Sequence, residues 1–258
     1  AILAETIALK FQSGQGDIGS LDKAVDLSRK AMELGSGLLE THRARGLVLE
    51  LTDNYEEAAR EYEAAIAINT NIADQHLALG RTYRFLEQYD KAVEEFNKAS
   101  GLNPTDPMPL IHISRTYATV GEWAKAIQYA QQAVKVRPSD PYLHGNLGVM
   151  LYRNRHYADA LPYLRLAVRG GVTEDGTEVR GLPLDYGRVA EYYFTYGLAL
   201  ARAGECGEGL QISQLLIDGV PNDETSVYNA KEMVTICKEI AGTPRPKPTS
   251  TPATDGGG

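Results

Sequence analysis

The side chains with the clearest potential for metal chemistry are three histidines and two cysteines. Neutral imidazole and thiolate are the usual zinc ligands, and a structural zinc site takes four of them. The histidines are His42, His76 and His144, and the cysteines are Cys206 and Cys237, 31 residues apart. Two cysteines at that separation make no zinc site without other ligands. We therefore expect neither a metal nor a cofactor.

Gly14, Gly16 and Gly19 have the spacing of the Gly-x-Gly-x-x-Gly dinucleotide fingerprint. That fingerprint holds a pyrophosphate only where it follows a strand and opens a helix. Residues 1–12 are apolar enough for a helix, and no strand pattern precedes the glycines. We interpret them as the turn between two helices.

Catalytic combinations are missing from the sequence. It shows no Ser-His-Asp ordering signal, no paired carboxylates in an apolar context and no phosphate loop. Those patterns supply the nucleophiles, general acids and phosphate cradles of many enzymes. We predict that the chain is not an enzyme.

The composition favours a folded, acidic chain. Its 258 residues are 43% hydrophobic and 23% charged, with a formal net charge of -8, so a generic nucleic-acid-binding role is disfavoured. No run approaches the ~20 apolar residues of a membrane helix. The chain begins with Ala rather than Met, which predicts a processed product or a fragment and leaves a removed signal peptide or an upstream membrane domain open.

The elements that position these residues repeat along the chain. Two alanine series recur every 34 residues without slippage, which is the signal of a repeat array. The series are Ala24, Ala58, Ala92, Ala126, Ala160 and Ala31, Ala65, Ala99, Ala133, Ala167. The predicted units lie near 5–38, 39–72, 73–106, 107–140, 141–174 and 190–223, with an insertion at 170–188, a capping helix at 224–241 and a tail at 243–258.

The unit 73–106 shows the pattern most clearly. Its small and aromatic positions are Gly80, Tyr83, Ala92, Phe96, Ala99 and Pro104. These residues resemble the tetratricopeptide repeat, a helix-turn-helix of 34 residues. The resemblance covers about 1–241 and implies an all-α, right-handed superhelical solenoid. It also implies that the first helix of each unit lines a concave groove.

Carried onto this sequence, the resemblance assigns the groove a set of basic, aromatic and amide side chains. They are Arg43, Arg81, Arg84, Arg115, Tyr142, Asn146, Tyr152, Arg153, Phe194 and Arg202, with Phe85 and His112 beside them. The acidic groove positions are Glu40, Glu50, Asp74 and Glu191. Arginine forks bind carboxylates, so one interpretation is a groove for an acidic or carboxylate-ended extended segment. The other is that the arginines pair with neighbouring acids and only keep the groove soluble.

The repeat also changes the interpretation of the histidines. His42, His76 and His144 all fall at the same unit position, where bulky residues pack. Equivalent sites of adjacent units lie ~10 Å apart, which is too far to share a metal. We therefore expect packing roles for them.

Two features depart from the repeat. The insertion reads GGVTEDGTEVRGLPLDYGR, and its Glu174-Asp175-Gly176 turn predicts a small hairpin or an ordered loop,. Insertions in repeat arrays often contact partners. Cys206 and Cys237 fall at ends of antiparallel helices that should meet, which leaves a disulfide or two buried thiols. A disulfide would imply an oxidising compartment.

The tail, TPRPKPTSTPATDGGG, is rich in Pro, Thr and Ser and has no apolar pattern. It could carry O-glycans at Thr243, Thr249, Ser250, Thr251 and Thr254. Three functions remain open: an interaction scaffold for a protein or peptide, an extracellular filament subunit that binds copies of itself through the tail, and an accessory domain of a larger envelope enzyme. An extracytoplasmic or cell-surface location is favoured over the cytoplasm.

Overall fold

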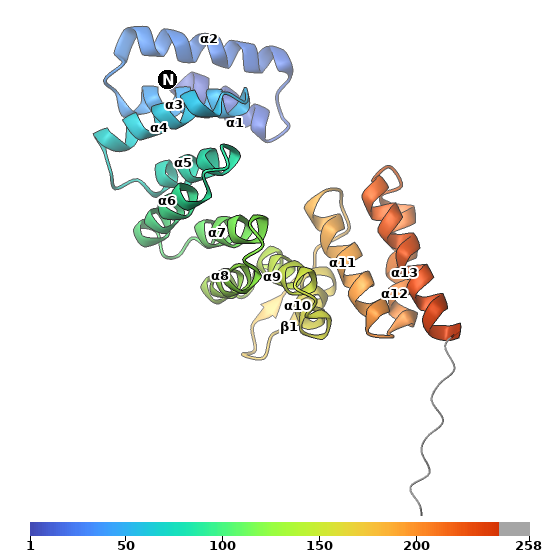
Figure 1. Ribbon diagram of the computed structural model, residues 1–258. Helices are drawn as coiled ribbons and strands as arrows, with labels where there is room; N and C mark the ends of the chain where they lie inside the picture. Colours follow the sequence, from blue (N-terminus) through green and yellow to red (C-terminus); the bar gives the residue numbers. More distant parts are fainter. Residues whose placement is uncertain (243–258) are drawn as a thin grey trace, which may run out of the picture.

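The computed structural model describes residues 1–242. Within them, thirteen helices and one small hairpin follow one another along a curved array (Figure 1). The helices are α1 (Ile2–Gln12), α2 (Ile18–Gly35), α3 (Leu39–Leu51), α4 (Tyr55–Ile68), α5 (Ala73–Phe85), α6 (Tyr89–Leu102), α7 (Met108–Thr119), α8 (Trp123–Val136), α9 (Pro141–Arg153), α10 (Tyr157–Arg169), α11 (Arg188–Arg202), α12 (Cys206–Gly219) and α13 (Glu224–Gly242). The hairpin strands are β1 (Gly171–Val172) and β2 (Glu178–Val179). The expectations for the tail fall on residues 243–258, outside the described part.

Successive helices form pairs, and each pair packs on the next. Odd-numbered helices from α1 to α11 pair with the helix that follows, and α13 packs on both α11 and α12. The stack runs from the blue N-terminal pair to the red α13 in Figure 1. No unit can bury its apolar face alone, so the stacking of neighbours creates the core. The predicted all-α solenoid is confirmed.

Small residues let the two helices of a unit approach closely. A Cβ atom added to Gly80 would lie 2.6 Å from the Phe96 ring, and one added to Gly148 would lie 2.5 Å from Cγ of Leu164. The alanines of the first 34-residue series are fully buried, as Ala92 is in this unit. The repeating small residues therefore set the spacing between helices, and the larger side chains fill the remaining space.

The histidines of the second and third units tie the two helices of a unit together. Nδ1 of His42 lies 2.6 Å from Oε2 of Glu61, and Nδ1 of His76 lies 2.6 Å from Oε2 of Glu95. In each pair the histidine and the glutamate are 19 residues apart in the sequence, and the second pair follows the first by one repeat of 34 residues. His144 instead stacks on the ring of Tyr163. In residues 1–242 no group of three or more His, Cys, Asp or Glu side chains is arranged to hold a metal ion.

The glycine motif lies at the junction of α1 and α2. Gly14 has a φ of +74° in the connecting turn, and Gly19 already belongs to α2. The N-terminus of α2 is capped by its own Asp17, whose Oδ1 accepts the backbone N–H of Ser20 at 2.8 Å. A carboxylate of the chain thus occupies the position that a phosphate would take.

The insertion between α10 and α11 is ordered. β1 and β2 pair antiparallel, with Gly171 opposite Val179, and Gly176 has a φ of +85° in the connecting turn. The strap that follows, 180–187, returns to the array: the N–H of Leu182 donates to the carbonyl of Ala167 at 2.8 Å. The hairpin is therefore held at the C-terminal end of α10.

The C-terminal end of the array is closed by α13. Cys237 of this helix forms a disulfide with Cys206, the first residue of α12, and their Cα atoms are 5.6 Å apart. Met233 is fully buried against α11, and the Ser213 hydroxyl donates to the carbonyl of Ala230 at 2.8 Å. No helix among the described residues combines the length and apolarity needed to cross a bilayer.

Candidate functional site

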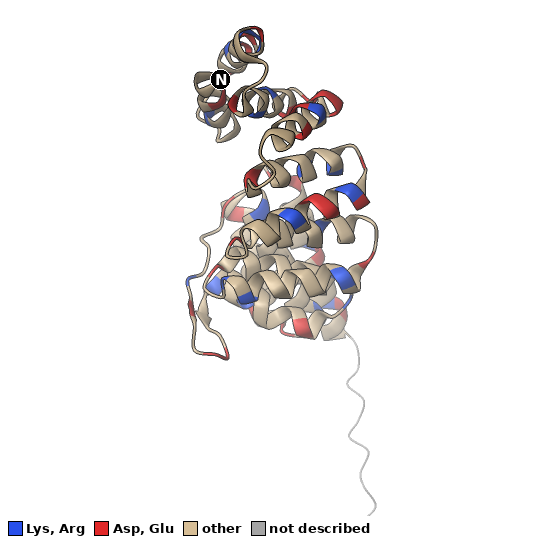
Figure 2. Cartoon of the chain, turned by 90° about the vertical axis from the view of Figure 1, so that its left-hand side faces the viewer, with Lys and Arg blue, Asp and Glu red and all other residues tan. Residues whose placement is uncertain are grey.

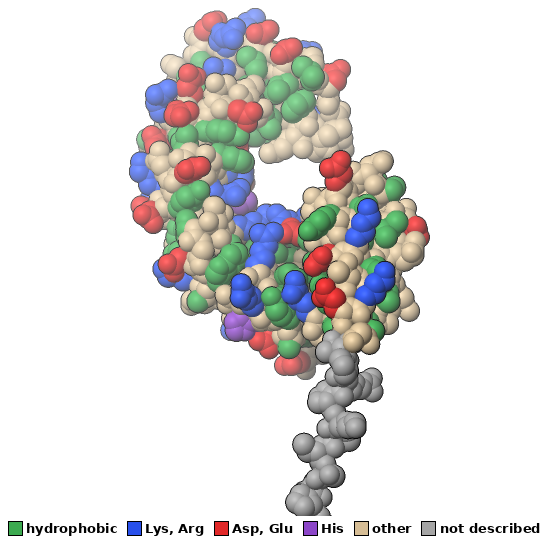
Figure 3. All heavy atoms as spheres, turned by 45° about the vertical axis from the view of Figure 1, so that its right-hand side comes forward, with side chains coloured by type: hydrophobic (Ala, Val, Ile, Leu, Met, Phe, Trp, Pro, Cys, Tyr) green, Lys and Arg blue, Asp and Glu red, His purple; other side chains and the backbone are tan. Residues whose placement is uncertain are grey.

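The first helices of the units form the inner wall of the array. Neighbouring first helices contact each other from α3 through α5, α7 and α9 to α11. Figure 3 shows the resulting hollow, with Lys and Arg side chains gathered on its inner wall. From the other side, Figure 2 shows acidic and basic residues interspersed along the helices. A group of positively charged side chains therefore lies on the concave wall.

Three of the predicted groove arginines form ion pairs with carboxylates of the same chain. Arg43 pairs with Glu5 at 2.7 Å and Arg153 pairs with Glu191 at 2.7 Å. Arg81 donates from Nε and Nη2 to the two carboxylate oxygens of Glu50 at 3.0 and 3.1 Å, a bidentate pair between successive units. These contacts match the interpretation in which groove arginines pair with neighbouring acids.

Arg84 and Arg115 differ from these three. Among the described residues no carboxylate pairs with either, and Nε of each is buried without a hydrogen-bond partner. Arg115 donates from Nη2 to the amide oxygen of Asn146 at 3.0 Å. Arg84 lies over the ring of Phe85, 5.4 Å from its centroid. Two guanidinium groups on adjacent inner helices thus lack a counter-ion within the chain.

Arg188 adds a third cation to this wall. It is the first residue of α11, and its Nη1 lies 2.6 Å from Oε2 of Glu191, which Arg153 also contacts. Sequence reasoning missed Arg188 because it lies where the insertion breaks the 34-residue register. The only local signal was an acid three residues later on a predicted helix. We refer to Arg84, Arg115 and Arg188 as the arginine cluster.

The pKa shifts separate the paired from the unpaired arginines. Burial would lower the pKa of Arg81, but the hydrogen bonds and charge of Glu50 outweigh it and raise that pKa. For Arg84, burial and the nearby charges of Arg81 and Arg188 lower the pKa. Burial, with the charge of Arg188 second, lowers the pKa of Arg115 to about 10. With a pKa of about 10, Arg115 stays charged at neutral pH, and an added anion would offset the repulsion among these arginines,.

The remaining predicted groove residues provide aromatic surface and support. Tyr142 is 46% exposed, and the amide nitrogen of Asn146 donates to its carbonyl at 2.8 Å. The Tyr152 hydroxyl accepts from Nε of Arg202 at 3.0 Å. Phe194 is partly buried against the core. Tyr142 and Asn146 therefore lie beside the arginine cluster. Tyr152 and Arg202 instead hydrogen-bond to each other.

His112 is buried next to the arginine cluster. Its ring stacks on Phe96 and its Nδ1 has no partner in the described structure. Burial first, then the charges of Arg115, Arg81 and Arg84, lowers the pKa of His112 to about 3. The imidazole is therefore neutral over the physiological pH range.

We expect His112 to make the protein sensitive to acid. The unfolded chain takes up a proton near pH 6.5 and the folded chain only near 3, so the stabilisation is complete above pH 6.5 and declines as the pH falls towards 3,. Between pH 7 and pH 5, His112→Gln should lose about 2 kcal/mol less unfolding free energy than the wild type in urea titrations, since one pKa unit is worth about 1.4 kcal/mol. The exposed control His156→Gln should follow the wild type. If His112→Gln also follows it, the buried ring does not set the acid response.

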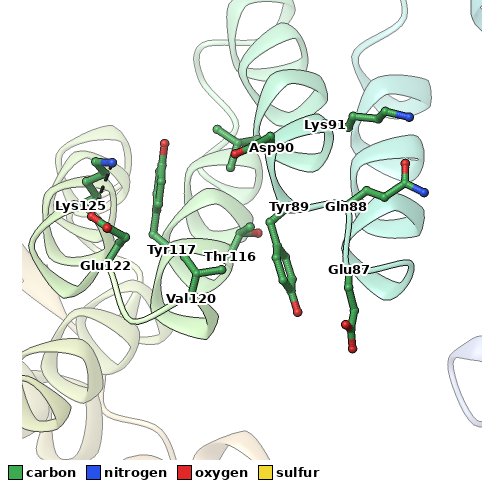
Figure 4. Close-up of a pocket in the computed structure, with 11 residues that line it drawn as sticks. Glu87, Gln88, Tyr89, Asp90, Lys91, Thr116, Tyr117, Val120, Glu122 and Lys125 are labelled. Carbon is green, nitrogen blue, oxygen red and sulfur yellow. Dashed lines mark ion pairs between the residues drawn. The ribbon is translucent and has the colours of Figure 1, made fainter.

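A second hollow lies at the turns of the third and fourth units, outside the arginine cluster. It is a cleft of about 680 Å³ beside Tyr89 and Tyr117 (Figure 4). Its lysines are engaged locally: Nζ of Lys125 lies 3.5 Å from Glu122 and 5.0 Å from the centroid of the Tyr117 ring. None of the side chains that line it has a buried polar atom without a hydrogen-bond partner, as Arg84 and Arg115 do.

Comparison with known proteins bears on the family and the fold. Two family models, both described as tetratricopeptide repeat, match residues 76–106 and 113–172. A search of curated proteins found no match. Among solved structures, PilF of Pseudomonas aeruginosa is 18% identical, with 90% of this chain and 95% of that chain covered and a TM-score of 0.67.

Two further structures show the same architecture. A chain of the structure described as the APC/C hetero-tetramer Cut9-Hcn1 is 14% identical, with 93% of this chain and 43% of that chain covered and a TM-score of 0.64. YrrB, described as a TPR protein with an unusual peptide-binding site, is 18% identical, with 80% and 97% covered and a TM-score of 0.53. At these identities the likeness concerns the fold. The two family matches identify tetratricopeptide repeats within this chain, and the regular stack of helix pairs continues the same architecture along the array.

Proposed function

We propose that the chain is a non-enzymatic protein-interaction scaffold whose concave groove binds an extended, acidic peptide segment. The observation that carries this proposal is the pair Arg84 and Arg115, which have no carboxylate partner among the described residues. The fold supports the general role, because a solenoid exposes a long concave surface suited to an extended chain. YrrB, which shares the fold, is described as binding a peptide.

The electrostatics of the groove favour a negatively charged ligand. Burial, together with the charges of nearby arginines such as Arg188, lowers the pKa of both arginines, so the folded chain holds these charges at a cost. A carboxylate placed between them would accept charge-assisted hydrogen bonds from groups such as the free Nε atoms. The ligand would thereby supply the counter-ion that Glu50 provides for Arg81.

Exposed aromatic surface beside the arginine cluster would contact the rest of the ligand. Tyr142 is 46% exposed and Phe85 is 51% exposed, and Phe85 is held in place by stacking on Tyr55. Aromatic and arginine side chains are the residue types most often found at binding hot spots. An acidic segment with some apolar side chains therefore fits this wall better than a purely acidic one.

The test is a binding titration with a fluorescein-labelled peptide of alternating Glu and Leu residues. We expect the double variant Arg84→Gln/Arg115→Gln to bind it about tenfold more weakly or worse, since one lost charge-assisted contact is worth about 1.5–3 kcal/mol. The affinity of the wild type should also fall with added salt.

The matched control is Arg29→Gln/Arg60→Gln, which removes two exposed arginines from second helices and should leave the affinity unchanged. Circular dichroism verifies that each variant is folded. Equal affinity of the wild type and the Arg84→Gln/Arg115→Gln variant would rule out this groove as the binding site.

A further inference from the structure

Two members of the arginine cluster hold positions at which the preceding interface has an ion pair. Glu50 of α3 accepts from Arg81 of α5, and the two residues are 31 apart in the sequence. One repeat of 34 residues later, the same two positions are held by Arg84 and Arg115. A cation thus stands where the second unit has its carboxylate, and two arginines hold the positions of one ion pair.

The surroundings show that these two pairs of positions are equivalent in space. A Cβ atom added to Gly46 would lie 2.8 Å from the Tyr62 ring, and one added to Gly80 would lie 2.6 Å from the Phe96 ring, again one repeat later. The first helices also contact each other at both places, α3 with α5 and α5 with α7. The stacking that brings a carboxylate to an arginine at the first interface therefore brings two arginines together at the second.

The chain does not replace the missing carboxylate. Nε of Arg84 and of Arg115 is buried without a hydrogen-bond partner in residues 1–242, yet both residues are partly exposed, so a ligand can reach their outer N–H groups. Burial first, then the charge of Arg188, lowers the pKa of Arg115. The charge of Glu191 opposes this shift, but Glu191 already bonds to Arg153 and Arg188. A counter-ion for the pair therefore has to come from a ligand.

The number of acceptor oxygens favours a phosphate monoester over a carboxylate. Glu50 uses both of its oxygens on one guanidinium, with contacts of 3.0 and 3.1 Å to Arg81. A phosphate monoester has three strong acceptor oxygens and a charge of about −1.5 to −2 at pH 7, so it can accept from two guanidinium forks at once. A phosphodiester carries a single charge, which disfavours a nucleic acid as the ligand.

The pair of cations occurs at one place along the repeat. In the following unit the corresponding positions hold Ala118 and Val149. Arg188 of α11 adds a third guanidinium here: after burial, its charge is among the causes that lower the pKa of both Arg84 and Arg115. A phosphate is therefore directed to a single part of the concave wall, at the contact of α5 with α7.

We propose that the arginine cluster binds the phosphate of a phosphorylated serine or threonine in the segment that the groove holds. This inference rests on the proposed function and narrows its ligand from an acidic to a phosphorylated peptide. Arginine clusters are a recurring means of recognising phosphorylated segments. Because serine and threonine side chains are short, the bound phosphate brings the peptide backbone close to the wall, where the exposed rings of Phe85 and Tyr142 can contact its neighbours.

The experiment measures the binding of four fluorescein-labelled peptides to the full-length chain by fluorescence anisotropy, at about pH 7.5 where the phosphate carries nearly two charges. Three share an alternating Glu and Leu sequence and differ only in a central Ser, Glu or phosphoserine. The fourth has the central Glu and one more Glu at its end, which matches the charge of the phosphopeptide. We expect the phosphopeptide to bind about tenfold more tightly than either Glu peptide, because a second guanidinium gains charge-assisted hydrogen bonds.

Arg84→Glu tests the site with a change that the fold already accommodates. It places a carboxylate where the second unit has Glu50, so this carboxylate can pair with Arg115, and the preference for phosphoserine over Glu should disappear. The matched control Arg60→Glu makes the same change of charge at an exposed position of a second helix and should keep the preference. Circular dichroism verifies that both variants are folded.

The outcomes separate this inference from the proposed function. If the phosphoserine and Glu peptides bind the wild type equally well, the groove takes acidic segments and the phosphate site is refuted. If none of the peptides binds, the proposed function fails as well. A preference that survives in Arg84→Glu would also overturn the assignment, as would displacement of the phosphopeptide by an equal concentration of a single-stranded oligonucleotide.

Discussion

Replacing Arg81 with Met should lower the free energy of unfolding of the second and third units by about 3–5 kcal/mol, the cost of removing one partner from a buried ion pair. The side chain of Glu50 is 7% exposed and accepts from two nitrogens of Arg81 and from the Tyr62 hydroxyl, which lies 3.0 Å away. Without Arg81 this carboxylate would be buried with only the tyrosine as a donor. The pair also links α3 to α5, so its loss weakens an interface between units.

Hydrogen exchange of the α3–α5 amides, together with urea titration, measures this effect. Arg84→Met is the matched control on the same helix: it removes a cation that has no counter-ion, so the stability should be unchanged or slightly higher. A double-mutant cycle with Glu50→Gln isolates the pair, and the two substitutions should be clearly non-additive. Equal effects of Arg81→Met and Arg84→Met would contradict the distinction between the paired and unpaired arginines.

Loss of the disulfide should produce the second large effect. Cys206→Ser/Cys237→Ser should destabilise the C-terminal cap by about 2–4 kcal/mol, the usual worth of a cross-link that closes a loop of this size. The bond joins residues 31 apart and fixes α13 against α12. If α13 detaches, the fully buried Met233 and Ile212 become exposed to water. Losing the bond therefore removes the stabilisation from loop closure and also weakens the cover over the apolar end of the array.

Urea titrations with and without a reductant provide the measurement. The wild type should lose stability when tris(carboxyethyl)phosphine is added, and the double Ser variant should not respond. The effect should be concentrated in hydrogen exchange of α12 and α13. If the reductant leaves the wild type unchanged, the bond does not stabilise the cap.

The sequence by itself determined the repeating part of this protein. Ala92 and its equivalents recur every 34 residues because every unit meets the same kind of neighbour, so the same small residue fits the close contact each time,. Local spacing was therefore enough to predict a repeat array of helices, and the resemblance to the tetratricopeptide repeat implied the solenoid and the face that lines the groove.

The tertiary structure decided which groove residues remain available. Arg81 and Arg84 lie three residues apart on α5, yet Glu50 of the preceding unit occupies the first and no described carboxylate reaches the second. Whether an arginine of α5 meets a carboxylate depends on how the preceding unit is positioned against α5. Likewise, Arg188 joins the cluster only because the insertion folds back onto the array, which also places the hairpin and His144 in the lining of one cleft. Each of these contacts joins residues that are distant in sequence and occurs only once in the described structure, so the repeating pattern does not predict it.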